Sequence, residues 1–516
     1  MLTREQAISR LQSGEHFDLL VIGGGATGAG VALDAASRKY RVALIEREDF
    51  GSGTSSKSSK LVHGGVRYLA NGEFSLVREA LHERALLLQN AAHLVKPQGF
   101  VIPVKHVGEK LKFSLGLWLY DKLAGDDKFE RSRRLSFAQL QAALPTLDTA
   151  QFNGAVRYSD AQFDDTRLLW DIIDKARSYD ATVANYCRAT GIIKHNGKIT
   201  GVEVLDRESG SQFSIKAKAV INATGAWSDE IVAFDQTNQS GGIIASQGTH
   251  VVVDRKFFPG EEALLIPETS DGRVMFVIPW HDRVVIGTTD EGLPSGSTEA
   301  SPTSGEIDLI LATSGEYLAT APGRADILAC FAGIRPLSAS GDGASTAKIS
   351  REHRIDVAHS GLITITGGKW TTYRRMAEDC VNMMEKSTDL PPRECVTKNT
   401  LINTPANDQR YSDYGCYAAE LASLAAQQPA LGERLNPALP YTLAEVTWAV
   451  QNEMARSIMD VLARRTRALF LDARAAIASA PTVAEILSLE LGKDSQWMEA
   501  ELNRFYQQAQ SFLVDV

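Results

Sequence analysis

The fold is decided by the stretch from Asp18 to Glu46, DLLVIGGGATGAGVALDAASRKYRVALIE. Its first residues, Asp18–Ile22, form a compact apolar run that ends at glycine, which predicts a short buried strand. A run rich in small residues follows and predicts a helix over 26–38. Residues 41–46 predict a second strand. The stretch is therefore one β-α-β unit with an acidic residue at the end of its second strand.

The turn of this unit has the spacing G-x-G-x-x-G. Gly23 permits a tight turn, Gly25 lets the backbone approach a diphosphate, and Gly28 lets the helix pack closely on the strand. The helix N-terminus supplies N–H donors and a partial positive charge, and an acid at position 46 can accept hydrogen bonds from ribose hydroxyls. The predicted dinucleotide contacts are Gly23, Gly25, Ala26, Thr27, Gly28 and Glu46.

Two later segments narrow the dinucleotide to FAD. Residues 219–227, AVINATGAW, and residues 362–372, LITITGGKWTT, are both strands that run into glycine. Backbone N–H groups after the second strand can face a flavin ring or an anion. Three strand-to-glycine crossings far apart in the sequence indicate one long cofactor that lies across the edge of a sheet.

Composition limits the remaining classes of protein. The chain has 516 residues and a formal net charge of -9, with no extended basic run, which argues against nucleic acid as a partner. It has no apolar run of the roughly 18 residues that a membrane span needs, and its N-terminus lacks the apolar core of a secretory signal. We therefore expect a cytoplasmic location. The 5 cysteines form no C-x-x-C pair, and no metal site is predicted.

The length exceeds what one core supports, and the patterns interleave. The fold class is α/β plus α, with a Rossmann-like FAD-binding domain, an antiparallel-sheet substrate domain and a helical C-terminal domain. Thr442-x-x-Glu445 and Thr482-x-x-Glu485 both resemble helix-starting capping boxes. The expected domains are residues 1–90, 151–235 and 325–386 for FAD, 91–150 and 236–324 for substrate, and 409–516 for the helical domain.

Four segments place cations among small or turn-forming residues, which predicts a site for an anionic substrate beside the flavin. They are SSKLVHGGVRYL (58–69), FAGIRPL (331–337), ISREHR (349–354) and GGKWTTYR (367–374). With the fingerprint, INATGAW, GTHVVV, FVIPW and IGTTD, the first, second and fourth of these segments resemble the FAD-dependent glycerol-3-phosphate dehydrogenases. That family is the respiratory, quinone-linked type within the D-amino-acid-oxidase-like flavoproteins. The resemblance covers about residues 15–380 and continues more loosely into the helical tail.

The resemblance implies oxidation of sn-glycerol 3-phosphate to dihydroxyacetone phosphate, with electrons passed through FAD to a membrane quinone. It implies that Arg67, Tyr68, Arg351 and Lys369 hold the substrate and that Arg335 lies nearest the reacting carbon and the flavin. The further residues that we expect at the FAD site are Arg47, Thr54, Ser55, Ser56, Ser59, Lys60, Leu61, His63, Gly64, Gly65, Ala223, Gly225, Trp227, Gly333, Arg335, Gly368, Lys369, Trp370 and Thr371.

Oxidation of a secondary alcohol also needs a base for the hydroxyl proton. A neutral imidazole suits this role near pH 7. His63 and His250 both lie in matching segments, and the residues slightly favour His63 because its segment also carries Arg67. Arg335 or Lys369 can stabilise charge that develops on the oxygen.

Residues 110–123, KLKFSLGLWLYDKL, combine an apolar run with basic ends and fit either an interfacial helix or a packed one. We expect peripheral contact with the cytoplasmic face of the inner membrane. Arg464, Arg465 and Arg467 leave a homodimer or membrane contact open for the helical tail. Three other readings stay open: a glycerol-3-phosphate oxidase that uses O₂, a flavoprotein of the same fold that acts on an amino or hydroxy acid, and a non-catalytic flavin-binding sensor or assembly subunit.

Overall fold

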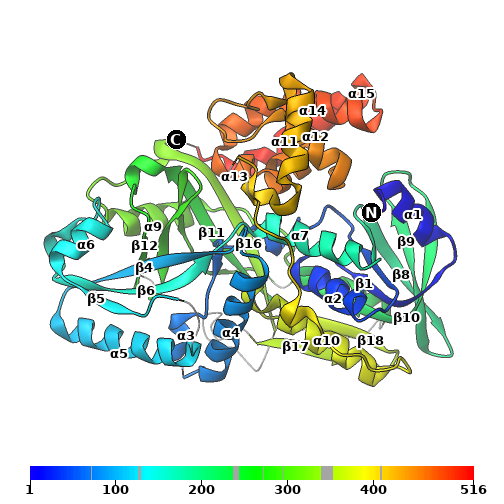
Figure 1. Cartoon of the computed structure of the whole chain (residues 1–516), viewed down its shortest axis with the longest axis horizontal. Helices are drawn as coiled ribbons and strands as arrows, with labels where there is room; N and C mark the ends of the chain where they lie inside the picture. Colours follow the sequence, from blue (N-terminus) through cyan, green and yellow to red (C-terminus); the bar gives the residue numbers. More distant parts are fainter. Residues whose placement is uncertain are drawn as a thin grey trace.

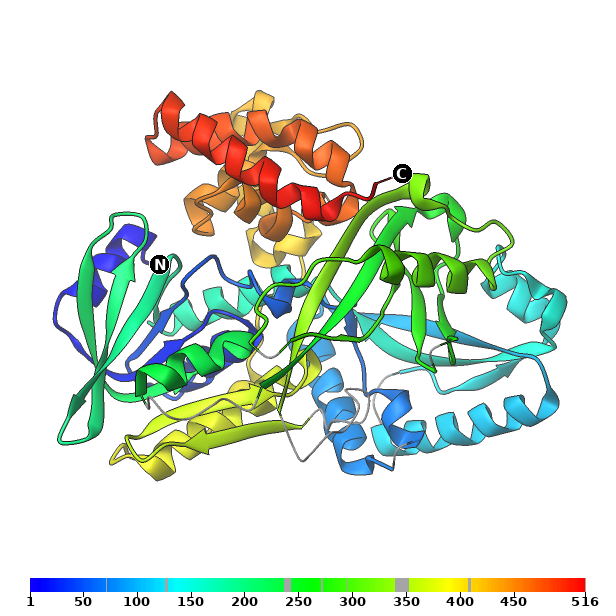
Figure 2. The ribbon, with the colours of Figure 1, turned by 180° about the vertical axis from the view of Figure 1, so that it is seen from behind.

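The computed structural model describes residues 1–70, 72–125, 129–235, 243–270, 272–294, 296–338, 352–406 and 410–515, with Arg67, Ala70 and Ser338 described by their backbone alone. Within these ranges the strands form two sheets. Figure 1 shows the sheet that contains β1 on the right, the sheet that contains β4 on the left, and the C-terminal helices above them. Figure 2 shows from behind that the last helices lie over the junction of the two sheets.

The first sheet is mainly parallel. Its path runs β17-β18-β10-β1-β2-β7, and β9 and β8 extend it from β10. Successive residues of β1 face opposite sides: Leu19 and Val21 join one buried cluster with the helices α2, α7 and α10, while Leu20 and Ile22 join another with α1. The strands are β1 His16–Ile22, β2 Val42–Ile45, β7 Thr182–Ala184, β8 Cys187–His195, β9 Lys198–Asp206, β10 Gln212–Asn222, β17 His353–Val357 and β18 Leu362–Gly367.

The second sheet is mainly antiparallel, and its long strands β11 and β16 pair from Ile243↔Ser338 to Val253↔Ile327. Strands β6 and β16 belong to it, whereas the sequence groups both with the FAD-binding segments. A strand's own residues do not reveal its hydrogen-bond partners, which explains the difference. The strands are β3 Leu61–Val62, β4 Lys96–Val104, β5 Arg133–Leu135, β6 Gly154–Gln162, β11 Ile243–Asp254, β12 Ala263–Ile266, β13 Met275–Trp280, β14 Arg283–Gly287, β15 Glu291–Gly292 and β16 Ile327–Ser338.

Helices cover both faces of both sheets. None of them, in the described ranges, is both long and apolar enough to span a bilayer. The helices are α1 Arg4–Gln12, α2 Ala26–Ser37, α3 Val66–Ala70, α4 Phe74–Asn90, α5 Val107–Ala124, α6 Phe137–Ala143, α7 Asp165–Ser178, α8 Ser228–Asp235, α9 Ser304–Gly315, α10 Tyr373–Ser387, α11 Ala418–Gln427, α12 Leu443–Asn452, α13 Ala468–Leu471, α14 Ala473–Leu491 and α15 Ser495–Ala509.

The two expected capping boxes have different outcomes. Thr442 and Glu445 do form a capping box at the start of α12. The prediction for Thr482 was wrong, because it lies inside α14, whose N-cap is Asp472 with its side chain accepting from the N–H of Ala475. A Thr-x-x-Glu spacing also occurs within a helix, so the motif alone does not mark a helix start.

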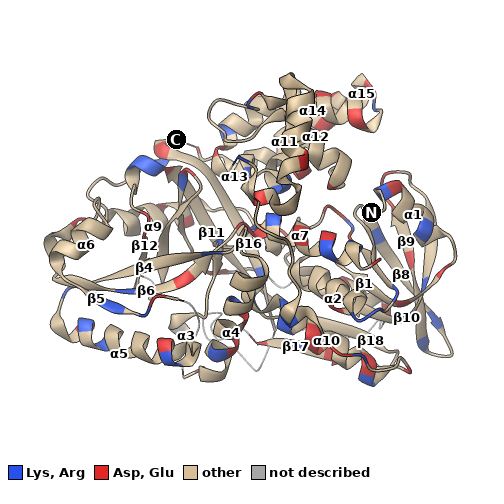
Figure 3. Ribbon diagram, viewed as in Figure 1, with Lys and Arg blue, Asp and Glu red and all other residues tan. Residues whose placement is uncertain are grey.

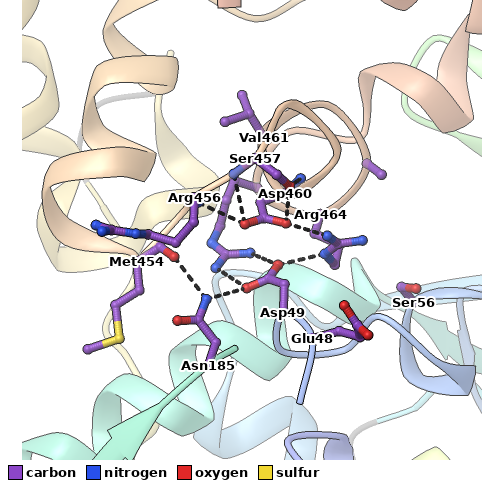
Figure 4. A network of polar contacts seen from close by, with 12 residues as sticks. Glu48, Asp49, Ser56, Asn185, Met454, Arg456, Ser457, Asp460, Val461 and Arg464 are labelled. Carbon is purple, nitrogen blue, oxygen red and sulfur yellow. Dashed lines mark hydrogen bonds and ion pairs between the residues drawn. The ribbon is translucent and has the colours of Figure 1, made fainter. Parts of the chain in front are cut away.

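Buried charges join the helical domain to the segment that follows β2 (Figure 4) and to the start of α7. Asp49 accepts hydrogen bonds from Arg464 at 2.6 Å and from Arg465 at 2.7 and 2.9 Å. Arg467 pairs with Asp165 at 3.4 Å. The three arginines are therefore committed inside the chain and are not available for a dimer or membrane contact, which corrects that reading. A homodimer stays a prediction.

Candidate active site

The glycine loops lie where parallel strands end at the same edge of the first sheet. Gly23 follows β1 with φ +110°, and a Cβ there would lie 2.6 Å from the carbonyl oxygen of Ala223, which follows β10. A Cβ on Gly28 would lie 1.9 Å from the carbonyl oxygen of Gly23. Both positions require glycine, so these two fingerprint residues are dictated by backbone packing at the strand ends.

The start of α2 fits a diphosphate. Its N-cap, Gly25, makes no side-chain cap, and its first turn holds no acidic residue. Protein charge therefore does not neutralise the partial positive end of the helix. Ser55 approaches from the segment that follows β2, and its Oγ accepts from the N–H of Ala26 at 3.0 Å. Glu46 holds the next turn by accepting from the N–H groups of Gly24 at 2.6 Å and Glu48 at 2.9 Å.

Other predicted cofactor residues gather around this turn. The Arg47 guanidinium lies 4.6 Å from the ring of Trp227, which follows Gly225. Trp370 donates from Nε1 to the carbonyl oxygen of Ser55 at 3.0 Å. Thr54 donates to the carbonyl oxygen of Ile334 at 2.7 Å, between Gly333 and Arg335. Segments far apart in the sequence thus converge at one site. The residues present at this site fit FAD.

The first histidine site joins His63 to the diglycine segment. The backbone N–H of His63 donates to Thr371 Oγ1 at 3.2 Å. Lys369 Nζ lies 3.8 Å from the ring centroid of Tyr68, and a Cβ on Gly65 would lie 3.6 Å from the same Nζ. Burial, with the cations Lys369 and Arg84 nearby, lowers the pKa of His63 to about 4. The imidazole is therefore neutral at pH 7 and can accept a proton.

The second histidine site lies on a long strand of the second sheet. His250, on β11, is 2% exposed, and its Nε2 is hydrogen-bonded to Ser59 Oγ at 2.8 Å. Its ring stacks on Phe331 with centroids 4.8 Å apart. Burial, followed by the charges of Arg335 and Lys60, holds the pKa of His250 well below its usual range. This imidazole is also neutral, but its side chain is enclosed.

Arg335 is held by its own sheet. Its guanidinium donates to the carbonyl oxygens of Gln247 at 3.1 Å and Thr289 at 3.0 Å, and to Thr288 Oγ1 at 2.9 Å. Asp290 Oδ1 lies 3.3 Å from Arg335 Nη1, and the Arg335 side chain is 23% exposed. The sequence did not single out Thr288 and Asp290, although both lie in the quoted IGTTD segment. Their arrangement orients a partly accessible cation.

The remaining predicted residues divide into three groups. Gly64 is held by Tyr120, which accepts from its N–H at 2.9 Å, and Gly368 has φ +81° beside Met376. Lys60 is fully buried, with its Nζ on Asp165 at 2.6 Å, and Leu61 is buried in β3. Arg351 and the side chain of Arg67 lie outside the described part of the chain. Among the described residues, no group of three or more His, Cys, Asp or Glu could hold a metal ion.

Comparison with known proteins identifies the family of the chain. Residues 18–374 match the family described as FAD dependent oxidoreductase, and residues 362–498 match the C-terminal domain of alpha-glycerophosphate oxidase. The chain is 37% identical over 540 residues to a mitochondrial glycerol-3-phosphate dehydrogenase of Macaca fascicularis, covering 97% of this chain and 74% of that one. It is 36% identical to the mitochondrial enzyme of Arabidopsis thaliana, covering 99% and 88%.

A solved structure extends the likeness to three dimensions. The glycerol-3-phosphate dehydrogenase of Bacillus halodurans, complexed with FAD, superposes with a TM-score of 0.78 at 27% identity and covers 99% of each chain. The glycine oxidase of Geobacillus kaustophilus, at 19% identity and a TM-score of 0.56, shares the fold over 75% of this chain. The chain is therefore an FAD-dependent oxidoreductase that belongs to the family of FAD-dependent glycerol-3-phosphate dehydrogenases.

Proposed function

We propose that this enzyme oxidises sn-glycerol 3-phosphate to dihydroxyacetone phosphate. One observation carries the proposal: the Lys369 ammonium lies beside Tyr68, next to the segment that bears the neutral His63, within the loops of the FAD site. A cation suits a phosphate, and a neutral imidazole suits removal of a hydroxyl proton. The names of the relatives supply the same substrate.

In this proposal each residue has a distinct role in substrate binding or in the reaction. Lys369 and Tyr68, with Arg67 and Arg351 as the resemblance implies, hold the phosphate. His63 accepts the hydroxyl proton; we prefer it to His250, whose ring is enclosed by Ser59 and Phe331. Arg335 stabilises negative charge that develops on the oxygen. FAD, when bound, supplies the acceptor for the hydride.

The test is anaerobic mixing of the flavin-loaded protein with glycerol 3-phosphate while flavin absorbance is recorded. We expect bleaching with glycerol 3-phosphate and much less with glycerol at the same concentration. Hydroxy acids and D-amino acids serve as further controls. Absence of bleaching with glycerol 3-phosphate, or stronger bleaching with an amino or hydroxy acid, would contradict the proposal.

The electron acceptor that we propose is a membrane quinone. A second candidate is O₂, favoured by the match of residues 362–498 to a domain named for alpha-glycerophosphate oxidase. The two differ in product: the quinone enzyme reduces a soluble quinone analogue with little peroxide, while the oxidase yields one peroxide per substrate. Measuring peroxide and quinone reduction in one aerobic assay separates them.

Helix α5 supports attachment to a membrane surface. Val107, Leu111, Leu115 and Trp118 are 81%, 61%, 64% and 55% exposed, and their spacing places them on one face of the helix. Exposed basic residues accompany them on α5 and β5 (Figure 3): Lys112, Lys122, Arg133 and Arg134. An apolar face with flanking cations suits an anionic lipid surface. We propose that α5 docks the enzyme on the cytoplasmic face of the inner membrane, where quinone is available.

Vesicle sedimentation tests this docking. We expect the protein to sediment with vesicles that contain anionic lipid, and the double variant Leu111→Glu/Leu115→Glu to stay in solution. Leu489→Glu is the matched control, because Leu489 is 81% exposed on α14 of the helical domain. Equal sedimentation of the double variant and the unmodified chain would exclude α5 as the docking helix.

A further inference from the structure

The segment Thr54–Lys60 has one side on the flavin site. Ser55 contacts the start of α2 through the N–H of Ala26 and contacts Trp370 through its own carbonyl. Thr54 donates a hydrogen bond to the strand that carries Arg335, and Ser59 is hydrogen-bonded to His250. A shift of this short segment therefore displaces groups beside the diphosphate and groups beside the proposed substrate at the same time.

Buried charges fasten the other side of the segment. The carbonyl oxygen of Ser56 accepts from Lys60 Nζ at 2.8 Å and from Arg467 Nη2 at 2.7 Å. Asp165 Oδ2 accepts from Lys60 Nζ at 2.6 Å and from Ser58 Oγ at 2.7 Å. The side chains of Lys60 and Asp165 are 0% exposed and that of Arg467 is 2% exposed. Such bonds are strong and directional because solvent is excluded.

Three parts of the molecule meet at this point. Lys60 Nζ lies 5.1 Å from the ring centroids of both Phe331, on β16, and Phe470, in the helical domain. The Arg467 guanidinium lies 3.8 Å from the ring of Phe470. Phe331 also stacks on His250. The helical domain therefore reaches the flavin segment directly through Arg467 and the substrate sheet through Phe470.

We infer that Lys60 and Arg467 are positioning residues, which set the place of the segment Thr54–Lys60 at the flavin site through the carbonyl oxygen of Ser56 and through Asp165. The helical domain thus takes part in FAD binding, although its own residues lie behind the segment. The link to FAD rests on the family; only the statement that a shift of the segment also displaces groups beside the substrate rests on the proposed function.

The alternative is that Arg467 merely helps to dock the helical domain. Arg465 provides the matched control: it is equally buried at the same junction, but its two-pronged bond goes to Asp49. Arg467→Met and Arg465→Met each remove one buried guanidinium from this junction. Both are expected to lower the unfolding midpoint of the FAD-free protein, while only Arg467→Met should disturb the flavin segment.

The experiment measures FAD affinity by fluorescence titration of the FAD-free variants, and the visible circular dichroism of the bound flavin. We expect Arg467→Met to weaken FAD binding at least 10-fold and to change the dichroism, Arg465→Met to change the affinity less than 3-fold, and Arg467→Lys to recover part of the loss. Should either Met variant fail to fold, Arg467→Lys and Arg465→Lys give the same contrast. Unchanged affinity in the Arg467 variants, or equal losses at both positions, would overturn the inference. No substrate is present, so the result does not depend on the proposed reaction.

Discussion

His63 and His250 make an instructive pair, because both are buried enough to lose their charge and yet their surroundings differ. The backbone of His63 is fixed by Thr371, and its neighbours include a cation, Lys369. The ring of His250 itself is fixed, with Ser59 on Nε2 and Phe331 stacked against its face. In the first case the protein holds the backbone, and in the second it holds the imidazole.

The pair shows that a lowered pKa is insufficient to identify a base. Both groups are neutral at pH 7, but a base must also reach the proton that it removes. An imidazole that already has a serine and a phenylalanine as partners is better suited to hold the segment around Ser59 in place. The predictions that follow test this division of roles.

The largest effect is expected for His63→Asn. Loss of a general base lowers kcat by about 1000-fold, while the backbone bond to Thr371 and FAD binding persist. The rate of anaerobic flavin bleaching by glycerol 3-phosphate measures the loss. His195→Asn, at an exposed position of β8, is the control and should keep the full rate. A rate within 3-fold of the unmodified enzyme would remove His63 from the reaction.

A smaller effect is expected for Lys369→Met. Loss of a charge-assisted bond to phosphate lowers kcat/KM by about 10- to 100-fold. The variant also shifts the pH profile: burial lowers the pKa of His63 most, and Lys369 lowers it further. The neutral base is present above its pKa and lost as pH falls through it, so removing Lys369 moves the acidic limb of kcat/KM to higher pH.

The control for this variant is Lys218→Met, which removes an ion pair between a 55% exposed lysine and Asp18 on the first sheet. Its profile should match that of the unmodified enzyme, because this pair lies near the start of β1, away from the strand ends that carry the glycine loops. A Lys369→Met profile whose acidic limb stays in place would show that Lys369 does not act on the base.

The smallest catalytic effect is expected for His250→Asn. We expect kcat to fall less than 10-fold, and the free energy of unfolding to fall by about 1–3 kcal/mol as Ser59 loses a well-placed buried partner. Thermal unfolding and flavin bleaching measured on one preparation separate the two effects. A loss of kcat as large as that of His63→Asn, with unchanged stability, would reverse the roles of the two histidines.

The sequence predicted the dinucleotide turn because its signals are local. The strand, the glycines, the helix and the acidic residue all occur between Asp18 and Glu46. Glycine is required at positions 23 and 28 because a Cβ there would clash with backbone atoms. The resemblance then brought in the segments around Arg335 and Lys369. These parts needed no knowledge of which side chains meet.

The partnerships between side chains could not be read in this way. Ser59 and His250 are 191 residues apart in the sequence, and neither segment contains a pattern that indicates contact with the other. The charges of Arg464, Arg465 and Arg467 are visible in the sequence, but carboxylate partners for them lie in the segment after β2 and in α7, so an exposed role was the wrong expectation. Burial decides such roles, and burial depends on the whole fold.

The order of strands in the first sheet determines when, relative to its synthesis, the protein can bind FAD. Strand β10 lies between β1 and β18, so the cofactor site needs strands from the first 50 residues and from Leu362–Gly367. At ribosomal rates of about 5–20 residues per second, the growing chain waits tens of seconds for the last of these. Arg467 emerges later still. FAD can therefore bind only at the end of synthesis or after it, and a cell short of flavin would accumulate full-length chains without the cofactor.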